Sequence, residues 1–175
     1  MQLRIVPTLE DQRVAKLAAL AIGIHVLESV LPSPIPGIKP GLANIVTLIV
    51  FLVYGLSSAV WVSLLRVLVG SLIVGTFLSP TFVLSLSGAI ASIVALYVVA
   101  KCRWLNLSAV GVAVLMAMAH MSSQFVVVYA FFIPHQAIFD ILPVMLTVAL
   151  VFGVVNGILA QKIYDKLQRI NYVDS

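Results

Sequence analysis

Residues 42–78 read LANIVTLIVFLVYGLSSAVWVSLLRVLVGSLIVGTFL, and this stretch decides the fold class of the protein. Its only charged residue is Arg66. A helix that crosses a membrane needs about 20 predominantly apolar residues. The stretch is longer than one such helix, and Gly55 interrupts its apolar run. It therefore predicts two membrane helices, at about 42–54 and 58–78.

The rest of the chain shares this apolar character. Of its 175 residues, 62% are hydrophobic and 9% are charged, whereas a soluble domain carries about 25% charged residues. So few charges cannot cover a soluble protein of this size, which excludes a cytosolic enzyme, a nucleic-acid-binding protein and a disordered module. The single cysteine, Cys102, excludes a disulfide framework and a multi-cysteine metal site. We expect no cofactor, no metal and no nucleic acid.

Prolines, glycines and charged pairs divide the remaining sequence into further apolar runs. These runs predict four more helices, at about 15–31, 81–100, 109–133 and 138–163. The expected fold is all-α, a single integral membrane domain over residues 1–175 with six transmembrane helices between 15 and 163. A Pro/Gly-rich segment separates the first two helices. Residues 1–14 and 164–175 are expected to form a cytoplasmic N-terminal segment and a cytoplasmic tail.

The basic residues predict the orientation of this polytopic bundle. They gather before the first helix, between the fourth and the fifth, and after the sixth: Arg4, Arg13, Lys16, Lys101, Arg103, Lys162, Lys166 and Arg169. Lys and Arg are enriched in cytoplasmic segments. These three places lie on one side of a six-helix bundle, so both termini are predicted to be cytoplasmic, in a bacterial inner (cytoplasmic) membrane. Thr8 and Asp11 fit a capping box that begins the first helix near Thr8.

Arg66 is the first candidate for a binding site. A charge near the bilayer centre costs about 2.5–3.5 kcal/mol, so its presence there favours a functional role. We expect Arg66 to bind an anionic ligand inside the bundle. Alternatively, it bonds to free carbonyls or forms a structural ion pair with Glu28 or Asp140. These two carboxylates lie toward the outer side in this topology and also belong to the candidate site.

Lys39 and Asn44 are further candidates at the Pro/Gly-rich segment. Irregular backbone at membrane depth is tolerated where it lines a cavity or is buried in protein. The helix that begins after Gly41 also directs free N–H groups toward this segment, which favours an anion. The alternative is an ordinary outer loop in which Lys39 lies among the lipid headgroups.

His120 and Gln124 are spaced i, i+4 and therefore share one face of the fifth predicted helix. They are candidate ligand contacts, or they simply bridge helices by hydrogen bonds.

Two pairs of small residues predict close helix contacts. Gly153 and Gly157 form a GxxxG motif that is expected to pack the sixth predicted helix within the bundle. Ala15 and Ala19 have the same spacing near the cytoplasmic end of the first predicted helix. They form either a similar internal contact or a docking face for another membrane subunit.

Several motifs carry a family resemblance. Residues 35–48 read IPGIKPGLANIVTL, and SLLRVL at 63–68, GTFLS at 75–79, SLSG at 85–88 and AHMSSQ at 119–124 accompany them. Over about residues 15–165 the chain resembles the family known as heptaprenyl diphosphate synthase component I, or Gx transporter. That family is similar to the substrate-binding S components of energy-coupling factor (ECF) transporters, which are six-helix membrane proteins.

This resemblance implies roles for several residues. Ala15 and Ala19 would dock a transmembrane coupling subunit. A ligand-site role would fall to residues from the Pro/Gly-rich segment and three predicted helices: Lys39, Asn44, Arg66, His120 and Gln124.

The distribution of acidic residues also indicates whether the chain could catalyse prenyl-chain elongation. Prenyl-chain elongation needs clustered carboxylates that hold magnesium, and no predicted span contains two adjacent acidic residues. We therefore expect no catalytic residue and no enzyme activity. The chain also has no nucleotide-binding P-loop, so active transport would require separate ATPase subunits.

The preferred functional hypothesis is a substrate-binding membrane subunit that captures a small anionic organic molecule, such as a vitamin or an isoprenoid or quinone precursor. Uptake would need a membrane coupling subunit and ATPase subunits. The alternative is an accessory membrane subunit of a polyprenyl diphosphate synthase or another quinone-biosynthesis enzyme. A purely structural role in a larger membrane complex is a third hypothesis.

Overall fold

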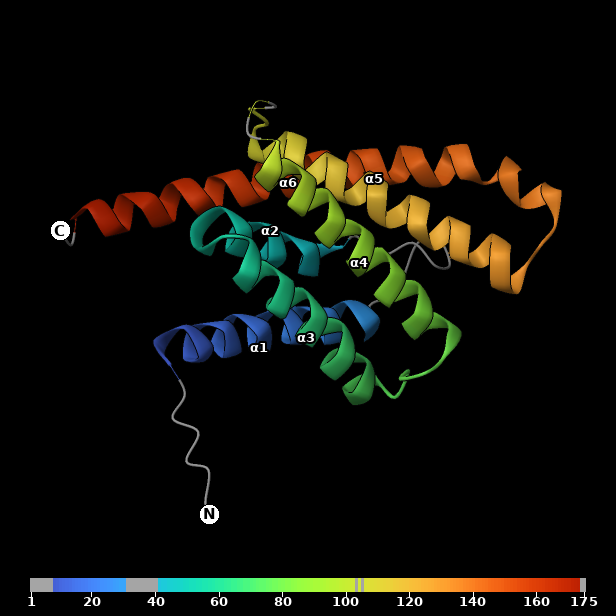
Figure 1. The fold of residues 1–175 in the computed structure, drawn as a ribbon, viewed down its shortest axis with the longest axis horizontal. Helices are drawn as coiled ribbons and strands as arrows, with labels where there is room; N and C mark the ends of the chain where they lie inside the picture. The colour runs from blue at the N-terminus through green and yellow to red at the C-terminus, as the bar shows by residue number, and fades with distance from the viewer. Residues whose placement is uncertain (1–7, 31–40, 103, 105, 174–175) are drawn as a thin grey trace, which may run out of the picture.

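The computed structural model describes residues 8–30, 41–102, 104 and 106–173, and these residues form helices and connections without a strand. Figure 1 shows the arrangement of the six α-helices. Their bounds are α1 Leu9–Val30, α2 Leu42–Tyr54, α3 Leu56–Val74, α4 Pro80–Lys101, α5 Ala109–Val127 and α6 Leu142–Val173. A π-helical turn, η2 (Val128–Phe132), extends α5, and a 3-10 helix, η3 (Gln136–Asp140), precedes α6. The prediction of an all-α fold is confirmed.

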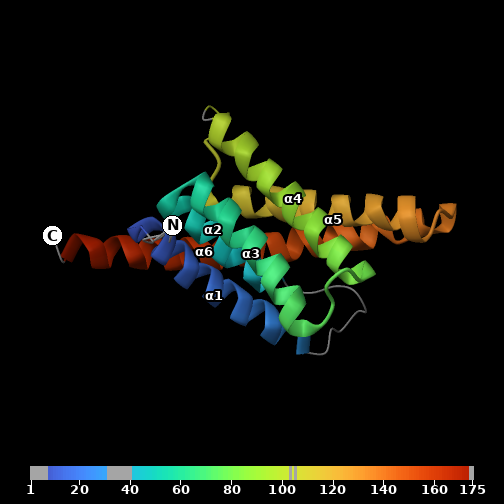
Figure 2. The ribbon, with the colours of Figure 1, turned by 60° about the horizontal axis from the view of Figure 1, so that its bottom comes forward.

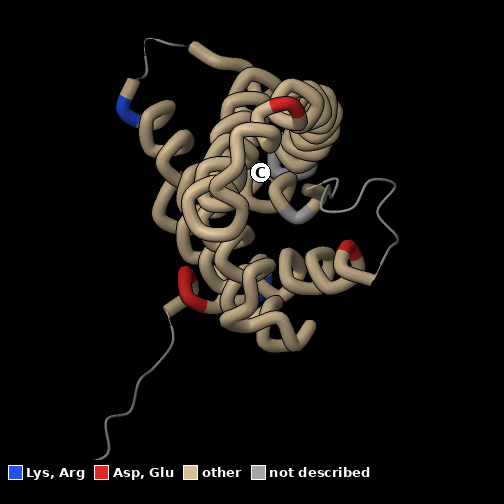
Figure 3. The backbone as a smooth tube through the Cα atoms, turned by 90° about the vertical axis from the view of Figure 1, so that its right-hand side faces the viewer, with Lys and Arg blue, Asp and Glu red and all other residues tan. Residues whose placement is uncertain are grey.

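Four of the described helical segments are long and apolar enough to cross a membrane by length and composition. They are Leu56–Val74, Pro80–Lys101, Ala109–Phe132 and Gln136–Arg169. Asn44–Tyr54 is apolar but shorter, and α1 carries both acidic and basic residues in its first turns. Charged residues are sparse along the backbone of the helices (Figure 3). The chain is therefore a helical membrane protein, while the six-span topology stays a prediction.

Helix α2 occupies the middle of the bundle, where it contacts α1, α3, α5 and α6. Its side chains Ile45, Val46, Leu48 and Val50 are buried, and they form the main hydrophobic core together with residues of the surrounding helices. Helices α5 and α6 lie side by side and extend beyond the other helices in both ribbon views (Figures 1 and 2). This leaves the tip of the α5–α6 pair outside the core.

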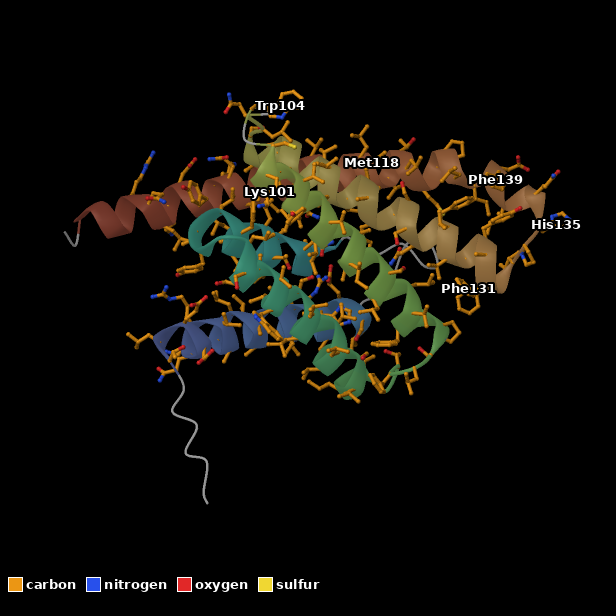
Figure 4. The ribbon with its side chains drawn as sticks, viewed as in Figure 1. Lys101, Trp104, Met118, Phe131, His135 and Phe139 are labelled. Atoms are coloured by element: carbon orange, nitrogen blue, oxygen red, sulfur yellow. The ribbon has the colours of Figure 1, made fainter. Side chains whose placement is uncertain are left out.

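The two described ends of the chain lie at the same end of the bundle (Figure 1). At that end the Arg13 guanidinium lies 4.8 Å from the ring centre of Tyr54, which connects the start of α1 to the end of α2. The α5–α6 connection lies at the opposite end, where His135 and Phe139 are labelled in Figure 4. This arrangement agrees with the distribution of basic residues, but which side faces the cytoplasm stays a prediction.

The predicted cap of α1 is present in the structure. Asp11 Oδ2 accepts hydrogen bonds from the Thr8 hydroxyl (2.7 Å) and the Thr8 amide (2.8 Å). The Thr8 hydroxyl oxygen in turn accepts the Asp11 amide at 3.1 Å. The hydrogen bonds from Thr8 hold the pKa of the Asp11 carboxyl below its usual value. The bond from the hydroxyl has the larger effect and the bond from the amide the smaller one. These reciprocal bonds satisfy N–H groups that a helix start leaves free.

The GxxxG motif of α6 lies against α5. A Cβ atom added at Gly153 would lie 2.9 Å from Val114 Cα, and one added at Gly157 would lie 2.6 Å from Val110 Cα. Both distances are too short for carbon atoms, so the two backbones approach this closely only because residues 153 and 157 have no side chain.

Candidate functional site

A cavity of about 260 Å³ lies among the helices. Five of the candidate residues line it, although they come from four different helices: Glu28 on α1, Asn44 on α2, Arg66 on α3, and His120 and Gln124 on α5. Helices α4 and α6 supply further wall residues, including Phe82 and Phe152. The cavity is thus polar on some sides and apolar on others.

Three other candidates do not line this cavity, and a fourth cannot be placed. Lys39 lies outside the described residues. Asp140 is exposed in η3 and does not line the cavity, so the structure does not bring it to the site. The reason is that α5 and α6 carry η3 to their protruding tip (Figure 4). Ala15 and Ala19 are exposed on α1, away from the cavity lining.

Arg66 contributes a positive charge to the cavity wall. Its side chain is 5% exposed, and its Nε atom has no hydrogen-bond partner among the described residues. A guanidinium carries five N–H donors and no acceptor. Because a buried donor without a partner is costly, the Nε position favours an additional acceptor in the cavity.

Glu28 is buried next to Arg66 and acts on it electrostatically. Its Oε1 atom also accepts the backbone N–H of Leu42, the first residue of α2, at 2.6 Å. Gly41 precedes this helix at φ 70°, in the left-handed region that glycine tolerates, and has no side chain to cap it. The carboxylate from α1 therefore takes the place of a capping side chain at the α2 N-terminus.

Asn156 on α6 also binds the start of α2, because its Nδ2 donates a hydrogen bond to the Gly41 carbonyl at 3.5 Å. Of the two carboxylates considered as structural partners for Arg66, Glu28 lines the same cavity and Asp140 does not.

His120 and Gln124 are linked to each other and to α4. Gln124 Nε2 donates to the Leu84 carbonyl at 3.2 Å and lies 3.1 Å from His120 Nε2. His120 Nδ1 lies 3.3 Å from the Ser92 hydroxyl, which donates to the Gly88 carbonyl at 3.0 Å. One assignment of hydrogens satisfies all these contacts: Nε2 of the ring accepts from Gln124, and Nδ1–H donates to Ser92. Both ring nitrogens are then used within the protein.

Gly88 makes room for the His120 ring. A Cβ atom at this position would lie 2.5 Å from Cε1 and Nε2 of His120. We predict that Gly88→Ala displaces the ring and breaks its bonds to Ser92 and Gln124. The loss of about 0.5–1.5 kcal/mol per hydrogen bond should exceed the gain of about 0.5–1 kcal/mol from removing a helical glycine. Ring nitrogen chemical shifts of ¹⁵N-histidine-labelled protein and thermal unfolding would measure both effects.

Gly111→Ala is the matched control for this prediction. Its added Cβ meets atoms no closer than 3.4 Å, an ordinary contact. The His120 ring signals should stay in place in this control and move in Gly88→Ala; unmoved signals in both variants would contradict the prediction.

The cavity lining also includes residues that were not among the sequence candidates. These are chiefly polar side chains from four helices and a connection: His25, Ser29, Ser71, Thr76, Ser85 and Asn156. Four had a signal in the sequence. His25 is three residues before Glu28, and Asn156 is a polar residue inside the apolar GxxxG region of α6. Ser85 and Thr76 lie in the SLSG and GTFLS motifs, whereas Ser29 and Ser71 have no comparable signal, since single serines are common in membrane helices.

Within the described residues, no group of three or more His, Cys, Asp or Glu side chains is placed to hold a metal ion. The polar atoms that line the cavity are instead a guanidinium, one carboxylate, imidazoles, amides and hydroxyls. This is a set of groups suited to recognising a polar organic molecule.

Fold and site together define a helical membrane protein with a small, partly open cavity that a buried arginine lines. The family model described as heptaprenyl diphosphate synthase component I matches residues 17–163. The chain belongs to this family. No curated protein and no solved structure gave a match.

Proposed function

We propose that this protein is a membrane subunit that binds a small organic anion in its cavity and presents it to partner proteins for uptake. The observation that carries the proposal is Arg66, a buried cation at the cavity wall whose Nε has no hydrogen-bond partner among the described residues. A carboxylate or phosphate oxygen would supply the missing acceptor in a charge-assisted hydrogen bond.

The size and lining of the cavity support a small ligand with an apolar part. Pockets for drug-sized ligands measure about 300–1,000 Å³, and this cavity lies just below that range at about 260 Å³. Val67, Phe82 and Phe152 offer apolar surface, while Asn44 and Gln124 offer amides. These groups would orient a molecule whose anionic end pairs with Arg66.

Uptake would require other subunits, as the proposed likeness to ECF transporters implies. We propose that a membrane coupling subunit docks on α1 at Ala15 and Ala19, which are exposed, and that separate ATPase subunits supply the energy. The protein would work in the cytoplasmic membrane with both ends of its chain in the cytoplasm.

The family description supports a second candidate function. As a component of a heptaprenyl diphosphate synthase, the protein would be a non-catalytic membrane subunit that binds a prenyl diphosphate for a catalytic partner. Arg66 could contact a diphosphate oxygen as it would a carboxylate, so the arginine alone does not separate the two functions.

Native mass spectrometry of the protein, extracted gently from its own membrane, tests the proposal. We expect the wild type to retain a small anion, and Arg66→Ala to lose it with an occupancy reduced at least about tenfold. The reason is that a hydrogen bond to a charged group contributes about 1.5–3 kcal/mol. Coupling or ATPase subunits that copurify would support uptake, whereas a copurified prenyl synthase would support the second candidate.

Arg169→Ala is the matched control, because it removes the same side chain from an exposed position of α6 that does not line the cavity. This variant should retain the ligand as the wild type does. A ligand that remains at full occupancy in Arg66→Ala would contradict the proposal.

A further inference from the structure

We infer that the ligand of this cavity carries a single negative charge and at least one hydrogen-bond donor, which the side-chain oxygen of Gln124 accepts. This inference rests on the proposed function and narrows its ligand class to small hydroxy monocarboxylates. The inference excludes apolar acids without a hydrogen-bond donor, and it excludes prenyl diphosphates.

The first step concerns charge. Among the described residues that line the cavity, the Lys, Arg, Asp and Glu side chains are Arg66 and Glu28. Glu28 already compensates part of the Arg66 charge, and its own charge is directed at the α2 N-terminus through Leu42. A ligand with one negative charge would find a partner in Arg66. Further charges, as on a diphosphate, would be buried without a comparable partner among the described lining residues, which is costly.

The second step concerns the Gln124 amide. Its Nε2 lies 3.2 Å from the Leu84 carbonyl, which only accepts hydrogen bonds, so the amide nitrogen must be on that side. The second amide hydrogen is directed at His120 Nε2, 3.1 Å away. With both hydrogens engaged, the group that Gln124 has left for a ligand is its carbonyl oxygen, an acceptor.

Two serine side chains of the cavity likewise offer a ligand hydrogen-bond acceptors rather than donors. The Ser29 hydroxyl donates to the Val26 carbonyl at 2.6 Å, and the Ser71 hydroxyl donates to the Leu68 carbonyl at 2.9 Å. Each hydroxyl therefore donates its hydrogen to a carbonyl of its own helix. Its oxygen lone pairs can still accept a hydrogen bond from another partner. Away from Arg66, these lining groups offer acceptors, and a ligand that fits them must bring donors.

His120 is a positioning residue in this scheme. Its ring nitrogens are engaged by Gln124 and by Ser92, which is itself bound to the backbone of α4. The ring thereby holds one amide hydrogen of Gln124 and determines which atom of the amide remains for the ligand.

The test compares matched acids with and without a donor. The probes are butyrate, pentanoate and hexanoate, their ω-hydroxy derivatives, and isopentenyl diphosphate. Binding to the full-length protein in lipid nanodiscs is measured by titration calorimetry, with empty nanodiscs subtracted. A neutral hydrogen bond corresponds to roughly a tenfold change in affinity. For at least one chain length, we expect the hydroxy acid to bind about tenfold more tightly than its parent acid, and isopentenyl diphosphate to bind more weakly than that hydroxy acid.

Variants assign the preference to Gln124. Gln124→Met keeps a side chain of similar length without an acceptor amide, and it should reduce the hydroxy-acid preference to less than about twofold. Ser87→Ala is the matched control, because the Ser87 hydroxyl donates to the same Leu84 carbonyl as Gln124 but does not line the cavity. It should keep the preference. If Gln124→Met fails to fold, the comparison of hydroxy acids with their parent acids on the wild-type protein still tests the inference.

The outcomes distinguish this inference from the proposed function. Equal binding of hydroxy and parent acids, lost in Arg66→Ala, would overturn the inference and leave the proposed function standing. Tight, Arg66-dependent binding of isopentenyl diphosphate would overturn the single-charge inference and support the second candidate function. Failure of every probe to bind in an Arg66-dependent way would count against the proposed function and therefore also against the inference.

Discussion

Glu28→Ala should destabilise the folded protein by about 1–3 kcal/mol, the cost of leaving a partly buried hydrogen-bond donor, the Leu42 N–H, without its acceptor. Glu28 is 5% exposed, acts on the buried Arg66 and binds the first N–H group of α2 at 2.6 Å. The alanine variant loses the compensating charge and the cap together. Unfolding in detergent micelles, followed by circular dichroism against a denaturant, would measure the change.

Glu28→Gln separates the loss of the carboxylate charge from the loss of the helix cap. Its amide oxygen can still accept the Leu42 N–H, but its charge is gone, so it should be more stable than Glu28→Ala by about the 0.5–2 kcal/mol of a lost cap. A wild-type unfolding midpoint for Glu28→Ala would show that Arg66 does not depend on Glu28. Equal midpoints for the two variants would show that the cap contributes nothing.

Gly157→Ala should destabilise the protein by about 1–3 kcal/mol, even though alanine is the better helix former. Its Cβ would lie 2.6 Å from Val110 Cα and 3.0 Å from Ala113 Cβ. The nearest of these atoms belongs to the backbone of α5 and cannot rotate away, so the two helices must move apart. Thermal unfolding of the protein in detergent would measure the loss.

Gly23→Ala is the matched control on α1. Nothing lies within 4 Å of its added Cβ, so the substitution should stabilise the helix by about 0.5–1 kcal/mol. The two glycine-to-alanine substitutions are therefore predicted to have opposite signs. A stabilised Gly157→Ala variant would mean that α5 and α6 do not approach as closely as the structure shows.

Helix positions followed well from the sequence because their causes are local. Apolar runs predicted each α-helix, and Gly55 separates α2 from α3 as expected. The ends were less accurate. Helix α1 begins at Leu9, as the capping box at Thr8 predicted but ahead of the apolar run that starts near residue 15, and α6 continues to Val173 beyond the predicted 163. Both extensions are polar, so a pattern that detects apolar runs does not include them.

The candidate site was predicted in part. Arg66 was identifiable because a charge in an apolar tract is costly, and His120 with Gln124 because helical spacing places them on one face. Asp140 met the same criterion of a carboxylate near a membrane span, but η3 lies at the exposed tip of the α5–α6 pair. Its distance from Arg66 depends on how far these helices extend past the core, which no local pattern encodes.

The sequence by itself determined that this is an all-helical membrane protein with a few polar residues among apolar helices, because composition and helical periodicity are properties of the chain alone. Only the tertiary structure decided what those polar residues do. Glu28 meets Leu42, and Gln124 meets Leu84, across contacts between different helices. Such contacts depend on how closely helices pack, and this packing decides which donors are already engaged and which acceptors remain for a ligand.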